Sequence, residues 1–292
     1  MLELILQALY SGLLAGGYYA MIALGLALVF GTMRIINLAH GELVLLAAYV
    51  AFEMERSFGW TPLASIPVAL VVVGLTALVI YLLIGRIRQD RELNSLILTF
   101  GIAIVLTNLI LMIWSADIRS TSNSWFMDGV VLGDTLFSMR GEVIFCVIGV
   151  LLLAATYWWL NHTWQGRALR AVASNRDAAK LMGVNPARIE ALSFLVSGVL
   201  ATFAGVAVYT ASVVFPAVGH NLTIKAFVIT VLAGMGSVPG VLLGAVLIGV
   251  GETLTTTLAK PSLQELTGMV IFLLILFLRP SGLFGRKGMV KK

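Results

Sequence analysis

Hydrophobic residues in this chain gather into long runs, and short polar or charged segments separate the runs. Most runs hold roughly 20 residues, the length that an α-helix needs to cross the hydrocarbon core of a bilayer. None alternates apolar and polar residues as the strands of a membrane β-barrel do. The pattern therefore predicts an all-α polytopic membrane protein with a single transmembrane domain over residues 1–292. The apolar runs are Leu4–Thr32, Ile35–Phe52, Leu63–Gly85, Leu93–Trp114, Val143–Leu160, Ala191–Val214, Ala226–Leu258 and Leu266–Leu278.

The seventh run, Ala226–Leu258, is long enough for two helices and contains residues that interrupt a helix. Gly234, Gly236, Pro239 and Gly240 divide it. Discontinuous helices inside a membrane bundle commonly line a transport path. We therefore expect a broken or re-entrant helix pair in the second half of the chain. In total we expect about eight to nine transmembrane helices.

Composition supports a membrane protein and gives it an orientation. Hydrophobic residues make up 60% of the chain and charged residues 11%, against about 25% in soluble domains. The net charge of +5 arises from a few loops and not from one basic face, which argues against nucleic acid as a partner. By the positive-inside rule, the basic segments 86–92, 161–190 and 279–292 should be cytoplasmic and segment 115–140 should lie outside. The C-terminus is therefore expected in the cytoplasm.

The sequence carries no catalytic or cofactor signature. It has no Gly-x-x-x-x-Gly-Lys-[Ser/Thr] loop for ATP and no His-Glu-x-x-His metal motif, and its three histidines are dispersed. We therefore expect a protein that is not an enzyme and that binds no metal or cofactor itself. Energy for transport would come from an ion gradient or from a partner chain.

The segment Asn37–Glu42 places ionisable groups at the start of an apolar run. Such groups are costly at membrane depth and usually face a cavity or a partner. On a regular helix, His40 and Glu42 would point about 200° apart. One interpretation is a bend, made possible by Gly41, beside the translocation path. The other is an interfacial helix start with Asn37 as N-cap and Glu42 in water.

Two further segments carry candidate residues. The basic segment around 165–186 predicts a short helix that Gly183, Asn185 and Pro186 end, and it could be either a solvated loop helix or a docking helix for another protein. The glycines at 234–240 indicate either close helix packing or backbone that faces a cavity. Glu252 is a candidate to face a cavity, because it lies in an apolar run.

In their order and spacing, these three segments resemble the permease subunits of bacterial branched-chain amino acid ABC importers, most closely the high-affinity leucine/isoleucine/valine type. The family's Asn-[Leu/Phe]-Ala-His-Gly-[Glu/Asp] stretch is present as Asn37–Glu42. Its basic segment is present as Gly166–Asn185. Its late glycine segment is present as Gly234–Gly240, with Ala233 where relatives often have glycine. The likeness covers nearly the full length of the chain.

The resemblance implies a multi-pass subunit of the bacterial inner membrane, surrounded by lipid. It would pair with a second permease subunit to form the pore. Two cytoplasmic ATPase subunits would bind the ATP, and a periplasmic substrate-binding protein would deliver the substrate. Within 161–190, the residues expected to couple to an ATPase are Gly166, Arg167, Arg170, Asn175, Ala178, Ala179, Gly183 and Pro186. The residues expected along the translocation path are Asn37, His40, Gly41, Glu42, Gly234, Gly236 and Gly240.

Other functions stay open at this point. Bacterial importers of urea and short amides have similar permeases with the same histidine–glycine–acid stretch. A secondary transporter driven by H⁺ or Na⁺ could use Glu42 or Glu252 for coupling. A membrane scaffold without transport is a third class.

Overall fold

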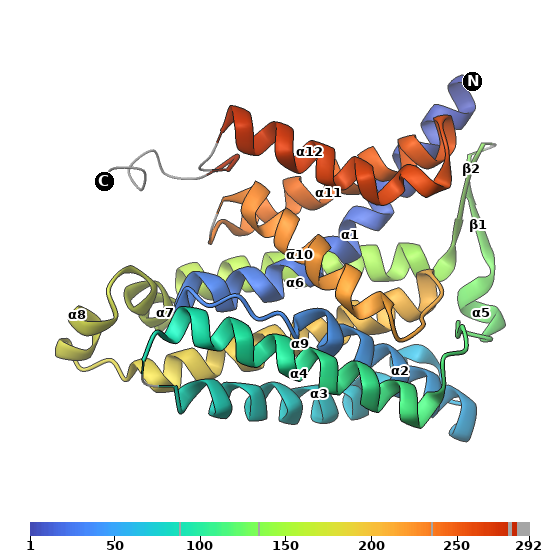
Figure 1. Ribbon diagram of the computed structural model, residues 1–292. Coiled ribbons are helices and arrows are strands. Elements are labelled where there is room, and N and C mark those ends of the chain that lie inside the picture. The colour runs from blue at the N-terminus through green and yellow to red at the C-terminus, as the bar shows by residue number, and fades with distance from the viewer. Residues whose placement is uncertain (88, 134, 235, 280–281, 285–292) are drawn as a thin grey trace.

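The computed structural model is a bundle of long helices that run side by side (Figure 1). It describes residues 1–87, 89–133, 135–234, 236–279 and 282–284. Two short strands form a hairpin at one end of the bundle. In chain order the elements are α1 (Leu2–Met33), α2 (His40–Phe58), α3 (Pro62–Gly85), α4 (Arg91–Trp114), α5 (Ser124–Met127), β1 (Gly129–Leu132), β2 (Leu136–Met139), α6 (Arg140–His162), α7 (Trp164–Ser174), α8 (Arg176–Leu181), α9 (Pro186–Ala211), α10 (Val218–Ala233), α11 (Val238–Leu258), η1 (Pro261–Leu263) and α12 (Gln264–Leu278).

Seven helical segments among the described residues are long and apolar enough to cross a membrane: α1, α3, α4, α6, α9, α11 and the η1–α12 segment. The polytopic all-α class predicted from the sequence is confirmed. A count of eight crossings additionally requires either α2 or the shorter apolar helix α10 to cross, and a count of nine requires both. The predicted division of the seventh apolar run is found, because α10 ends at Ala233 and α11 begins at Val238.

Helix α1 lies at the centre of the bundle and packs most extensively on α11 and α9. Small residues allow the close contact with α11. A Cβ added to Gly12 or Gly16 would collide with the α11 backbone at Val250 or Val246, and one added to Gly249 would lie 2.6 Å from the Gly12 carbonyl oxygen. The Gly12-xxx-Gly16 spacing therefore marks a helix–helix contact, as small residues do in membrane bundles.

Segment 115–140, which was predicted to lie outside, contains regular secondary structure. It contains α5 and an antiparallel hairpin in which Gly129 pairs with Met139 and Leu132 with Leu136. Trp125 is exposed, as expected of an interfacial anchor, but Phe126 is buried and packs on Phe145 of α6. Trp125 is therefore placed to act as an interfacial anchor, whereas Phe126 belongs to the core.

The hairpin and the basic segment lie at opposite ends of the bundle, with β1 and β2 at the right of Figure 1 and α7 and α8 at the left. This arrangement is compatible with the predicted outer position of 115–140 and inner position of 161–190. The basic segment forms two helices, α7 and α8, and not the single short helix that was predicted. Several residues used to predict orientation lie outside the described residues: Arg88, Arg286, Lys287, Lys291 and Lys292.

Candidate functional site

The Asn37–Glu42 segment lies at the entry to α2, where the chain bends before the helix begins. Residues 34–37 are neither helix nor strand, and α2 starts at His40 and continues regularly through Gly41. The Asn37 Oδ1 atom accepts a hydrogen bond from the Ala39 amide at 3.1 Å, which fixes the turn, while Ala39 occupies the N-cap position. The bend is therefore real, but it precedes His40 and is not located at Gly41. Asn37 is not the N-cap.

His40 joins α2 to two other helices. Its imidazole is completely buried, with Nε2 2.8 Å from the Ile22 carbonyl oxygen of α1 and Nδ1 3.5 Å from the Ser197 hydroxyl of α9. A Cβ on Gly25 would lie 2.7 Å from the ring, so the glycine in α1 provides the space for it. These contacts satisfy both ring nitrogens, as a buried polar group requires. His40 therefore holds α1, α2 and α9 together.

Gly41 is the point where α2 touches α10. Its amide donates to the Thr223 hydroxyl at 2.8 Å, and a Cβ at this position would collide with the Gly219 carbonyl oxygen and with Thr223. On the other side of the bend, the Leu38 amide donates to the Thr99 hydroxyl of α4 at 3.1 Å. The bend is therefore tied to α4 and α10 by hydrogen bonds from its backbone amides to two threonine hydroxyls, and the close approach of α10 leaves no space for a Cβ at Gly41.

Glu42 is buried and directed toward α10, away from the neighbours of His40. Only 2% of its surface is exposed, so the interpretation of Glu42 as a water-facing residue is wrong. A Cβ on Gly219 would collide with its carboxylate. Its Oε2 atom has no hydrogen-bond partner among the described residues. An unpartnered carboxylate oxygen at this depth marks a candidate functional group.

The basic segment is attached to the bundle through α7. The Thr163 hydroxyl caps this helix by accepting from the Gly166 amide at 3.1 Å. Gly166 itself lies directly against the backbone of α6 at Trp159 and Leu160. A buried face made of Ala168, Leu169 and Val172 packs α7 onto the bundle, which leaves Arg167 and Arg170 exposed. Helix α7 is therefore clearly amphipathic.

A short turn at Asn175 starts α8. Its side chain accepts from the amides of Asp177 and Ala178 at 3.1 and 2.9 Å. Gly183 adopts a φ of 83°, which favours glycine, and reverses the chain after α8. Pro186 is the first residue of α9. Asn175, Gly183 and Pro186 therefore shape the segment, Ala179 is buried inside it, and Ala178 is exposed.

A buried carboxylate clamps α8 to the bundle. Glu190 of α9, 1% exposed, accepts from Arg91 Nη2 of α4 at 2.9 Å and from Arg176 Nε of α8 at 2.7 Å. The hydrogen bond to Glu190 raises the pKa of Arg176 above its ordinary value, so the guanidinium stays charged. A cavity of about 270 Å³ lies beside this clamp, between the α7–α8 junction and the C-terminal end of α1. The ion pair between Arg176 and Glu190 thus attaches α8 to the bundle next to open space.

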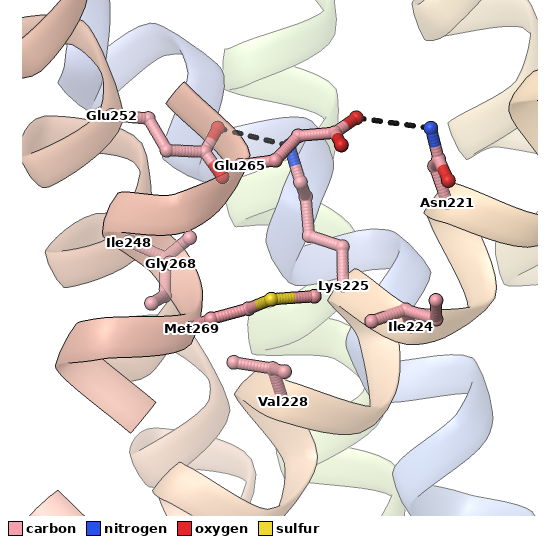
Figure 2. A pocket seen from close by; sticks show the side chains of 9 residues that line it. All are labelled: Asn221, Ile224, Lys225, Val228, Ile248, Glu252, Glu265, Gly268 and Met269. Carbon is pink, nitrogen blue, oxygen red and sulfur yellow. Dashed lines mark hydrogen bonds and ion pairs between the residues drawn. The ribbon is translucent and has the colours of Figure 1, made fainter. Parts of the chain in front are cut away.

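A second charged site lies between α10, α11 and α12 (Figure 2). Glu252, 2% exposed, forms an ion pair of 2.9 Å with Lys225 and accepts from the Tyr19 hydroxyl at 2.8 Å. Asn221 donates to Glu265 at 2.9 Å nearby. Glu252 lines the resulting pocket, as its position in an apolar run predicted.

The glycine segment forms the turn between α10 and α11. Gly234 and Gly236 have φ values of 85° and 86°. Gly240 donates to the Ser237 hydroxyl that caps α11 and lies against the Ala233 carbonyl. These glycines shape a tight turn, and their role on a translocation path stays a prediction.

Comparison with known proteins identifies the family. The sequence model of the family described as "Branched-chain amino acid transport system / permease component" matches residues 8–278. The chain belongs to this family.

The similarity between this permease and known proteins extends along nearly its whole length. It is 30% identical to the high-affinity branched-chain amino acid transport system permease protein BraD of Pseudomonas aeruginosa, with 96% of each chain covered. It is also 30% identical to the corresponding LivH protein of Escherichia coli K12, again over 96% of each chain. A more distant relative is the fructose import permease protein FrcC of Rhizobium meliloti, 28% identical over 74% of this chain and 61% of its own. The printed names of these relatives thus include two kinds of substrate, branched-chain amino acids and fructose.

Lys225 and Glu190, which form the buried ion pairs described above, were not predicted from the sequence of this permease. Lys225 is the only lysine or arginine between Arg188 and Lys260, and that isolation was the signal that could have revealed it. Glu190 was overlooked because it stands at the boundary between a basic segment and an apolar run. Leu181 and Met182, at the tip of α8, are 88% and 83% exposed and were read only as part of the helix.

Proposed function

We propose that this chain is the membrane-spanning permease subunit of an ATP-driven importer of branched-chain amino acids. The observation that carries the proposal is the similarity to branched-chain amino acid permeases across 96% of the chain. In this proposal the protein is a multi-pass subunit of the bacterial inner membrane with a cytoplasmic C-terminus. It pairs with a second permease subunit, and a periplasmic binding protein supplies the substrate.

The α7–α8 segment is proposed to dock on one of two ATPase subunits, which bind the ATP. Support comes from the two exposed apolar residues at its tip, Leu181 and Met182, because large exposed apolar side chains next to polar residues mark protein contacts. ATP-driven closure of the ATPase pair would move this segment and shift the pore between inward-facing and outward-facing states. The bend at Asn37–Glu42 lies where α1, α4, α9 and α10 meet α2, so a shift of these helices would alter the surroundings of Glu42.

Replacing Leu181 and Met182 together with glutamate is expected to release the ATPase subunits. Interface anchors of this kind are worth about 2 kcal/mol or more, so retention of ATPase on the purified permease should fall by roughly tenfold or more. Leu132→Glu, an exposed apolar residue of the hairpin at the opposite end, is the control and should retain the ATPase. Full retention in the double variant would contradict docking at the α8 tip. Substitution of Ala179 would not test docking, because Ala179 is buried and a larger side chain there would disturb α8 itself.

The substrate is tested by uptake into proteoliposomes that contain the complete complex and its binding protein. ATP-dependent uptake of leucine, isoleucine or valine is the expected result. Uptake of urea without leucine would favour a urea or short-amide importer. Uptake that persists without ATP and collapses with the proton gradient would favour an ion-coupled transporter. Absence of any flux would favour a membrane scaffold without transport.

A further inference from the structure

The pocket between α10, α11 and α12 combines both signs of charge with an apolar wall (Figure 2). Its polar side holds Asn221, Lys225, Glu252 and Glu265. Its apolar side is made by Ile224, Val228, Ile248 and Met269. Ionisable residues between membrane helices are expensive, and a buried ion pair is often no more stable than apolar residues of the same volume. Stability alone therefore gives little reason for the Lys225–Glu252 pair.

The pair leaves hydrogen-bonding capacity open toward the pocket. Lys225 has three donor hydrogens, of which Tyr19 and Glu252 take two, at 2.8 and 2.9 Å. The Glu252 Oε2 atom accepts from Tyr19, Lys225 and Gln264, while Oε1 has no partner among the described residues. A Cβ on Gly268 would lie 3.3 Å from Oε1, so the glycine leaves this oxygen uncovered. One cationic donor and one carboxylate oxygen are thus available side by side.

We propose that this pocket binds the zwitterionic headgroup of an α-amino acid on its passage through the permease. The ligand carboxylate lies at Lys225, and its ammonium group lies between Glu252 and Glu265. The apolar side chain of the ligand lies on Met269, Ile224 and Val228. This inference rests on the proposed function, because it assigns substrate contacts for that transport.

The size of the pocket agrees with this assignment. Its volume is about 50 Å³. At about 10–15 Å³ for each water molecule, that space holds roughly four waters. An α-amino acid headgroup has five non-hydrogen atoms, so it fills the polar part while a branched side chain remains at the open mouth.

Protection of a cysteine at the pocket rim tests the proposal. Met269→Cys is introduced with Cys146→Ser, and the complete complex is placed in phosphatidylcholine nanodiscs with and without trapped ATP. Leucine at about ten times its dissociation constant should slow maleimide labelling of this cysteine about tenfold in at least one state. Leu273→Cys, an exposed position on the same helix that does not line the pocket, should label at an unchanged rate. Equal effects at both positions, or none at either in both states, would overturn the proposal.

Analogues and charge variants sharpen the result. Leucinamide lacks the carboxylate and 4-methylpentanoate lacks the ammonium, so neither should protect at the same concentration. Lys225→Gln should abolish protection by leucine. Glu265→Gln changes an exposed residue, and it should raise the leucine concentration for half-protection by up to about fivefold. Protection by leucinamide alone, or by phosphatidylethanolamine regardless of leucine, would overturn the amino-acid assignment.

The same preparation separates this inference from the proposed function. Leucine transport by the complex without any protection at Met269→Cys would reject the pocket and leave the importer function intact. Absence of leucine transport, with uptake of urea in its place, would reject the function itself.

Discussion

Gly41→Ala is expected to prevent the helix bundle from assembling correctly. The added Cβ would occupy the space of the Gly219 carbonyl oxygen and of Thr223, and both obstacles belong to the α10 contact and not to a flexible side-chain end. The substitution would also separate the Gly41 amide from the Thr223 hydroxyl. Overpacking typically costs about 1–3 kcal/mol, and a lost hydrogen bond that leaves a buried group unsatisfied costs about 1–3 kcal/mol more. The measurement is the yield of monodisperse protein in detergent and the midpoint of its thermal aggregation.

Gly101→Ala is the matched control for this prediction. Gly101 lies inside α4, and a Cβ there meets no atom within 4 Å. Alanine is the better helix former by up to about 1 kcal/mol, so this variant should be as stable as the natural chain or slightly more stable. Equal stability of the Gly41 and Gly101 variants would show that the contact between α2 and α10 is not required.

Glu190→Gln is expected to uncouple transport from ATP hydrolysis. Glutamine keeps the volume of the buried side chain but loses the charge that holds Arg176 of α8 and Arg91 of α4. The cavity beside the clamp then allows α8 to move without moving α4 and α9. Coupling energies between sites are typically about 1–3 kcal/mol, so substrate transported per ATP should fall about tenfold while ATPase activity changes less than about twofold. The readout is the ratio of the two rates in proteoliposomes.

Two further variants decide whether the ion pairs of Glu190 couple the movement of α8 to the bundle or only stabilise the fold. Arg188→Gln removes an exposed charge two residues away and should leave the ratio unchanged. Arg176→Lys keeps the charge but loses the fixed geometry of the guanidinium, so it should give an intermediate ratio. A parallel loss of transport and ATPase activity in the Glu190 variant, with reduced protein yield, would contradict the role in coupling.

Much of the architecture was predictable because the membrane imposes simple rules on a sequence. Apolar runs of about 20 residues, interrupted by Gly234, Gly236 and Pro239, located most helices and the break between α10 and α11. Gly12 and Gly16, four residues apart in the first apolar run, lie at a close helix contact. Local composition could not reveal that α7 and α8 are separate, because Asn175 looks like any polar loop residue until its side chain is seen to cap α8.

Some properties of the candidate functional residues were likewise predictable from the sequence, and others were not. The sequence located the His40–Glu42 segment and predicted that the two side chains diverge, and they do contact different helices. It could not decide whether Glu42 faces water, because burial depends on α10, nearly 180 residues further along the chain. The Lys225–Glu252 pair and the Glu190 clamp were missed for the same reason: each joins residues from helices that only tertiary packing brings together.

By itself, then, the sequence determined the class of protein, the positions of most membrane helices and the membership of a transporter family. These properties depend on local hydrophobicity and on motif order, which can be read along one chain. Tertiary structure alone decided which polar groups are buried, which of them pair, and where charged groups retain open hydrogen-bonding capacity beside a pocket. Those properties depend on distances between helices, and hydrophobic patterning specifies which faces are apolar but not which neighbour each face meets.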